Sequence, residues 1–257
     1  MRTFIAGGGL GDCVLILNKL RRLGGPEDRL IYYLAEKQRN SEAVIREFWE
    51  SQGIRHEIQV VPEISTPLSR YDRAACRKLN PLIYGAGFVL VERWKWVFYP
   101  FDAFATPYVS FQSNPSPYEG YFVVQSDAGT MKYRGHKNWL NTGWIDDFIS
   151  GARQRGLKCV VVGSRDVGIS GADYRLFNLP LKDLFGILQR AEFVLGLQGF
   201  ITLIALCMQK RVLLKRENFR VILNYFHPRW RAHGKIFTEP AAWPESKTRA
   251  LLNWALA

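Results

Sequence analysis

A glycine-rich segment near the N-terminus constrains the fold more than any other feature of the sequence. A short apolar run at residues 3–6 precedes it, and glycine occupies positions 7, 8, 9 and 11. A helix follows, whose apolar face comprises Val14, Leu15, Leu17 and Leu20. A strand, a glycine loop and a helix in this order open an α/β fold. The glycines let a ligand approach the backbone, and the helix N-terminus suits a phosphate or carboxylate.

Asp12 determines which ligand classes this loop fits. The dinucleotide fingerprint needs Gly-x-Gly-x-x-Gly, and Asp12 stands where its third glycine belongs, so NAD binding is disfavoured. The Lys-Ser/Thr pair of the phosphate loop is also missing. Asp12 is therefore predicted to be either a helix N-cap or a base that points into a crevice.

The rest of the chain reads as two similar α/β halves. Predicted strands span 30–35, 54–61, 88–91, 121–125, 158–162, 192–195 and 212–214, with an extended segment at 174–179. Predicted helices span 41–51, 139–155, 181–191, 200–208 and 246–256. We expect two Rossmann-type parallel-sheet domains that face a cleft at the carboxyl ends of their strands. Their bounds are 1–109 and 121–245, with a linker at 110–120 and a C-terminal helix at 246–257.

The charge balance points to a polyanionic partner. The chain has 257 residues, and 35 Lys and Arg against 23 Asp and Glu give a net charge of +12. Such an excess favours nucleic acid, a phosphorylated glycan or an anionic membrane, although a basic surface that only confers solubility is the alternative. The four cysteines lack metal-type spacing. No apolar run is long enough for a membrane span, and no signal peptide is evident, so we expect a cytoplasmic protein.

Two basic clusters are the candidates for contacts to a polyanion. They comprise Arg70, Arg73, Arg77 and Lys78, and Arg216, Arg220, Arg229 and Arg231. An aromatic stretch at 93–108 also contains Arg93 and Lys95. Its rings could stack bases or sugars, or they could form an aromatic core between two lobes.

Four short motifs, in their order along the chain, resemble glycosyltransferase family 9, the ADP-heptose:lipopolysaccharide heptosyltransferases. They are Gly9–Asp12; Val123–Ser126 with Lys137–Trp139; Val160–Gly163; and Leu181–Gly196, which runs into Gly199 and a helix. The resemblance implies the GT-B fold and transfer of a sugar from a nucleotide sugar. It also implies that no metal or cofactor is needed, with the nucleotide sugar as co-substrate in the cytoplasm of a bacterium or phage-infected bacterium.

Carried over by position, the resemblance assigns roles to individual residues. Asp12 would be the general base that takes the acceptor proton, and Lys137 would stabilise charge on the leaving nucleotide. Alternatively, Asp12 only caps the helix and Lys137 is a solvated lysine at a helix start. The implied donor-binding residues are Gly9, Gly11, Ser126, Lys132, Gly163, Ser164, Gln198, Gly199 and Thr202.

The last loop and helix depart from the family pattern Asp-Ser-Gly-Pro-x-His-Leu-Ala. Residues 197–204 read Leu-Gln-Gly-Phe-Ile-Thr-Leu-Ile, so the acid and the histidine are both absent. The acceptor is open. We favour a hydroxymethylated base in DNA, flipped into the cleft as by phage DNA-modifying glycosyltransferases, over a lipopolysaccharide-like glycan, because no amphipathic membrane-binding helix is evident. A non-catalytic binding module is a further alternative, and so is a methyltransferase with Glu36 as its ribose-binding acid.

Overall fold

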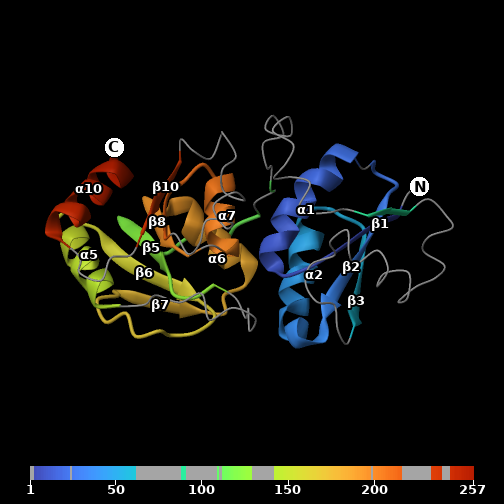
Figure 1. Ribbon diagram of the computed structural model, residues 1–257, viewed down its shortest axis with the longest axis horizontal. Helices are drawn as coiled ribbons and strands as arrows, with labels where there is room; N and C mark the ends of the chain where they lie inside the picture. The colour runs from blue at the N-terminus through green and yellow to red at the C-terminus, as the bar shows by residue number, and fades with distance from the viewer. Residues whose placement is uncertain are drawn as a thin grey trace. The chain divides into compact units, whose positions relative to one another are not determined.

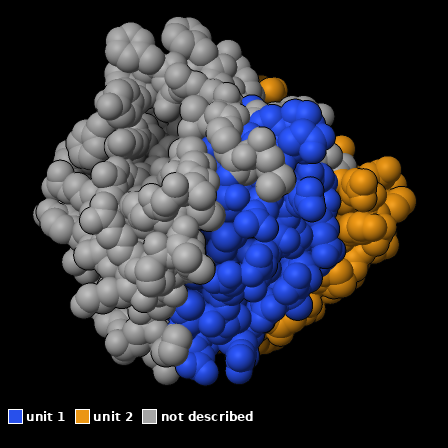
Figure 2. All heavy atoms as spheres, turned by 90° about the vertical axis from the view of Figure 1, so that its right-hand side faces the viewer, with its two compact units in different colours: residues 1–111 blue, residues 112–257 orange. Residues whose placement is uncertain are grey.

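The computed structural model describes residues 3–23, 25–61, 88–90, 109, 112–128, 142–197, 199–215, 233–238 and 244–257. The chain forms two compact units, residues 1–111 (unit 1) and 112–257 (unit 2) (Figure 2). Each unit contains a parallel β-sheet with helices packed against it (Figure 1). None of the helices in the described ranges is long and apolar enough to span a membrane.

Unit 1 has a four-stranded parallel sheet in the order β3-β2-β1-β4. Its strands are β1 (Thr3–Gly7), β2 (Arg29–Ala35), β3 (His56–Val61) and β4 (Phe88–Leu90). The helical elements are α1 (Leu10–Leu23), the 3-10 helix η1 (Glu36–Ser41) and α2 (Glu42–Ser51). The crossovers from β1 to β2 and from β2 to β3 run in the same direction, so right-handed connections place α1 and α2 on one face of the sheet (Figure 1).

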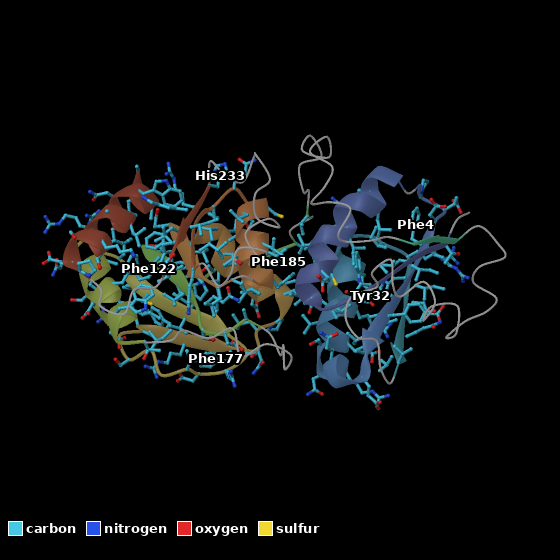
Figure 3. The ribbon with its side chains drawn as sticks, in the orientation of Figure 1. Phe4, Tyr32, Phe122, Phe177, Phe185 and His233 are labelled. Atoms are coloured by element: carbon cyan, nitrogen blue, oxygen red, sulfur yellow. The ribbon has the colours of Figure 1, made fainter. Side chains whose placement is uncertain are left out.

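The core of unit 1 forms between this sheet and these helices. All five residues of β1 and six of the seven in β2 are buried, as continuous apolar runs in a covered parallel sheet should be. Tyr32 is fully buried, and its ring packs against Trp49 of α2 with 5.5 Å between ring centroids. Phe4 and Tyr32 mark this layer in Figure 3.

Unit 2 has a six-stranded parallel sheet in the order β10-β9-β8-β5-β6-β7. The strands are β5 (Tyr121–Gln125), β6 (Lys158–Gly163), β7 (Tyr174–Phe177), β8 (Phe193–Gly196), β9 (Arg211–Lys215) and β10 (Gly234–Phe237). Strand β10 was not predicted, because its four residues include only two apolar side chains and follow a basic segment. It pairs in parallel with β9, and this pairing stabilises a strand that its own sequence does not predict.

In the described part of unit 2, two pairs of helices cover the faces of the sheet. The helices are α5 (Gly143–Arg153), α6 (Leu181–Arg190), α7 (Phe200–Cys207) and α10 (Glu245–Leu256). Helices α5 and α10 share one core cluster, in which Phe148 and Leu252 are fully or almost fully buried (Figure 1). Phe122 of β5 stacks on Phe193 of β8 with 4.8 Å between centroids. Helix α5 was expected to begin at residue 139, but residues 129–141 lie outside the described part of the chain.

The segment at residues 112–120, predicted as part of a linker, lies along α6. The amide of Asn114 donates to the carbonyl of Lys182 at 3.1 Å, and its Nδ2 donates to Asp183 Oδ1 at 2.7 Å. The carbonyl of Asn114 faces Gly186, where a Cβ would lie 1.9 Å from the oxygen. This close approach requires glycine in the middle of α6.

Replacing Gly186 by alanine is therefore expected to lower the free energy of unfolding by about 1–3 kcal/mol, because the new methyl group forces two backbones apart. Denaturant unfolding of the variant measures this loss. Gly151→Ala in α5 is the control, since its Cβ would come no closer than 3.0 Å, to a methyl group of Thr248. Equal stabilities of the two variants would show that the segment at 112–120 does not pack on α6.

Candidate active site

The glycine loop of unit 1 lies at the place where the strand order of the sheet reverses. β2 flanks β1 on one side and β4 flanks it on the other, and the loop leaves the carboxyl end of β1. Open α/β sheets bind their ligands outside the carboxyl ends of the strands at such a switch point. Gly8 is required here, because its φ is +140° and a Cβ would lie 2.4 Å from Asp12 Oδ2.

Asp12 is the third residue of α1 rather than its N-cap, which corrects one of the two predictions for it. The helix begins at Leu10, and the Asp12 Oδ2 accepts a hydrogen bond from the Gly9 N–H at 2.9 Å. The Asp12 amide in turn donates to the Gly9 carbonyl at 2.9 Å. The carboxylate thus bonds to the backbone N–H just before the helix, and it lies beside the positive end of the helix dipole. Gly11, a predicted donor-binding residue, is the second residue of this helix.

A second turn in unit 1 has the same hydrogen bonds. The Gly25 N–H donates to Asp28 Oδ2 at 2.8 Å, and the Asp28 amide donates to the Gly25 carbonyl at 3.1 Å. This turn precedes β2 and so lies at the amino edge of the sheet. The hydrogen bonds of Asp12 are thus also those of an ordinary turn, but Asp12 lies in the first turn of α1 and at the carboxyl edge of the sheet. Asp28 is the natural control for Asp12.

The strand order of unit 2 reverses between β5 and β8, and predicted donor-binding residues gather around the loops that follow β5, β6 and β8. Ser126 and Asp127 follow β5, and Ser164 follows β6. The Ser164 amide donates to Asp127 Oδ1 at 2.7 Å, and the Ser164 hydroxyl donates to Asp127 Oδ2. The Ser126 hydroxyl lies 3.0 Å from Asp127 Oδ1 and 2.9 Å from the Arg165 carbonyl. These bonds fasten the first two loops together.

Two glycines keep this edge of the sheet compact. At Gly163, a Cβ would lie 1.9 Å from the Ser126 hydroxyl and 2.5 Å from Asp127 Oδ1. At Gly199, a Cβ would lie 2.9 Å from the amide nitrogen of Gln125 and 3.1 Å from Cβ of Ala128. The loop after β5 therefore packs directly against the loops after β6 and β8.

The Thr202 side chain is buried and holds the last of these loops. Its hydroxyl donates to the Leu197 carbonyl at 2.9 Å, and it accepts from the Gly199 amide at 3.2 Å. The loop thus enters α7 in a fixed conformation, with glycine as the residue before the helix. A direct contact from Thr202 or Gly199 to a donor stays a prediction.

Sequence reasoning missed three residues of these two edges. Asp127 is buried and joins two loops, Lys215 is a buried lysine at the carboxyl end of β9, and the Tyr32 hydroxyl contacts the glycine loop. A charged residue at or just beyond the end of an apolar strand was the available signal for Asp127 and Lys215. The remaining predicted site residues lie outside the described ranges: Lys132, Lys137, Gln198, Arg70, Arg73, Arg77, Lys78, Arg216, Arg220, Arg229 and Arg231, as does the aromatic stretch at 93–108.

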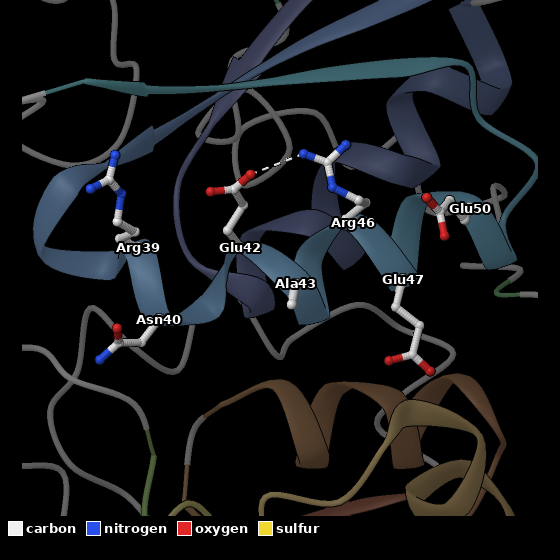
Figure 4. Close-up of a pocket in the computed structure, with 7 residues that line it drawn as sticks. All are labelled: Arg39, Asn40, Glu42, Ala43, Arg46, Glu47 and Glu50. Carbon is white, nitrogen blue, oxygen red and sulfur yellow. Dashed lines mark hydrogen bonds and ion pairs between the residues drawn. The ribbon is translucent and has the colours of Figure 1, made fainter.

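A surface hollow along α2 is distinct from these two edges. Its volume is about 430 Å³, and its described lining comprises Arg39, Asn40, Glu42, Ala43, Arg46, Glu47 and Glu50 (Figure 4). Glu42 and Arg46 form an ion pair at 2.9 Å, and acidic side chains outnumber basic ones among these described residues, so this part of the lining does not suit a polyanion. In the described ranges, no group of three or more His, Cys, Asp or Glu side chains could hold a metal ion.

Comparison with known proteins places this fold. No protein-family model matches the chain, and no curated protein sequence matches it. Several solved structures match the chain. Heptosyltransferase WaaC of E. coli with ADP aligns over 99% of this chain and 100% of its own, at 13% identity and a TM-score of 0.55. A glycosyl transferase family 9 structure from Veillonella parvula aligns over 99% and 92%, at 12% identity and a TM-score of 0.54.

The chain has the fold of glycosyltransferase family 9. This confirms the α/β prediction with two Rossmann-type parallel sheets, and the resemblance read from the four motifs holds at the level of the fold. A third structure is TibC from enterotoxigenic E. coli, described as an iron-containing dodecameric glycosyltransferase. It aligns over 83% of this chain at 15% identity and a TM-score of 0.51, and this chain spans 57% of the length of TibC.

Proposed function

We propose that this chain is a glycosyltransferase that moves a sugar from a nucleotide sugar to a hydroxyl group of a polyanionic acceptor. The observation that carries the proposal is the fold shared with WaaC, whose structure contains ADP, over nearly the whole of both chains. The glycine loop with Asp12 and the fastened loops of unit 2 support it, because they occupy the edges where such folds bind ligands.

In this proposal the sheet edge of unit 1 acts on the acceptor, and the sheet edge of unit 2 binds the donor. Asp12 takes the proton from the acceptor hydroxyl as the sugar is transferred, which requires the two oxygens to come within hydrogen-bond reach. The loops that hold Ser126, Ser164 and Gly199 receive the nucleotide, with the N-terminus of α7 toward its phosphates. Lys137 stabilises charge on the leaving nucleotide, and no metal or cofactor takes part.

The acceptor is proposed from charge. A net charge of +12 fits a polyanion, and the two basic clusters would supply contacts to its phosphates. We expect duplex DNA that carries hydroxymethylated bases, with a phosphorylated glycan as the other candidate. A base acceptor must leave the duplex to reach a catalytic residue.

A donor screen tests the proposal. Purified protein is mixed with UDP-, ADP-, GDP- or CMP-sugars and with either hydroxymethylated duplex DNA or deacylated lipopolysaccharide core, and nucleotide release is measured. Nucleotide release that requires the DNA supports DNA as the acceptor. Release that requires the glycan instead identifies the glycan as the acceptor. Release should persist with a chelator and fall with salt. Binding of a nucleotide without release in any pairing would overturn the transferase proposal in favour of a binding module.

A further inference from the structure

Both backbone polar groups of Gly9 are bonded to side chains. Its N–H donates to Asp12 Oδ2 at 2.9 Å, and its carbonyl accepts from the Tyr32 hydroxyl at 3.2 Å. Asp12 belongs to α1, whereas Tyr32 lies in the middle of β2, the strand beside β1. One bond therefore connects the carboxylate to the glycine loop, and the other connects that loop to the sheet.

A buried thiol completes this arrangement. Cys13 Sγ lies 3.3 Å from the Tyr32 hydroxyl oxygen and 3.7 Å from the Gly9 carbonyl oxygen. Burial raises the pKa of the Cys13 thiol well above its ordinary value, so the thiol stays protonated and donates to Tyr32. The tyrosine hydroxyl accepts from the thiol and is thereby oriented to donate to Gly9.

The tyrosine itself has little freedom to move. Its exposed fraction is 0%, and its ring packs on Trp49 with 54° between the ring planes (Figure 3). The hydroxyl thus has a fixed position next to the glycine loop. A rigid support of this kind matters where a reacting group must be held within a fraction of an ångström.

We propose that Tyr32 is a positioning residue that fixes the Gly9 carbonyl and, through the backbone of Gly9, the orientation of the Asp12 carboxylate. The proposal rests on the proposed function, in which Asp12 is the base. In this proposal Tyr32 acts on the reaction through the glycine loop. A phenylalanine at this position keeps the ring and its packing but removes the bond to Gly9.

Tyr32→Phe tests the proposal, with Tyr33→Phe as the matched control. Tyr33 is the next residue of β2, is equally buried, and its side chain points to the other face of the sheet. Tyr32→Phe is expected to lower kcat about tenfold with an unchanged KM for the nucleotide sugar, while Tyr33→Phe leaves kcat near the wild-type value. The same two variants are compared by amide hydrogen exchange over residues 7–13, where only Tyr32→Phe should exchange faster.

The two measurements separate the possible failures. Unchanged exchange in Tyr32→Phe would overturn the positioning role, whatever the activity. Faster exchange with wild-type kcat would show that the held loop does not serve the reaction and would also overturn the proposal. A wild-type protein without turnover on any acceptor would overturn the proposed function itself, and faster exchange in Tyr32→Phe would then show only that Tyr32 supports the loop.

Discussion

Replacing Asp12 by asparagine is expected to lower kcat by about 10²–10⁴-fold, because the amide cannot take a proton from the acceptor hydroxyl. The amide oxygen can still accept from the Gly9 N–H, so the first turn of α1 survives. The loss of a negative charge near the helix N-terminus costs only about 0.3–1 kcal/mol of stability. Nucleotide release under saturating donor, together with thermal unfolding, measures both effects.

Asp28→Asn is the control for this experiment. Asp28 accepts from Gly25 in the same turn geometry, but it lies at the amino edge of the sheet. It should lose little stability, because Asp28 is not at a helix end, and no activity. If Asp12→Asn keeps kcat within about threefold of the wild type, Asp12 serves only the helix, since a lost general base costs far more.

Replacing Asp127 by alanine is expected to lower both the stability of the fold and the affinity of the proposed donor site. The carboxylate is buried and accepts from the Ser164 amide and hydroxyl and from the Ser126 hydroxyl. Hydrogen bonds to a buried charge are each worth about 1.5–3 kcal/mol and are not additive, so we expect a loss of about 2–4 kcal/mol. With the loops after β5 and β6 released, nucleoside diphosphate affinity should fall at least about tenfold, which equals about 1.4 kcal/mol.

Asp173→Ala is the control that separates an effect on stability from an effect on nucleotide affinity. Asp173 also accepts from a backbone amide, that of Cys159 at 2.7 Å, and pairs with Arg153 at 2.9 Å. Cys159 lies near the start of β6, so this group is at the amino edge of the unit 2 sheet. Denaturant unfolding and calorimetric titration with ADP and UDP should show that both variants lose stability, whereas only Asp127→Ala loses affinity. Equal affinities in the two variants would place the donor elsewhere.

The pattern of strands and helices was largely readable from the sequence because it depends on local order. The apolar run of β5 and the helical periodicity of α6 predicted both elements to within one residue. The glycine loop could be placed because a strand and an amphipathic helix enclose it. Strand β10 shows the limit of prediction from the sequence, because its short sequence becomes a strand through its pairing with β9.

The arrangement of the candidate site was decided by the tertiary structure. Asp127 and Ser164 are 37 residues apart, and Tyr32 and Gly9 are 23 residues apart, yet each pair is joined by a hydrogen bond. Such bonds form only after parallel strands bring the ends of distant segments to one edge of a sheet. The sequence alone thus determined which elements form and where the glycine loop lies. Only the packing of strands determined which polar side chains hold that loop and the loops of unit 2, because those partners are neighbours in space and not along the chain.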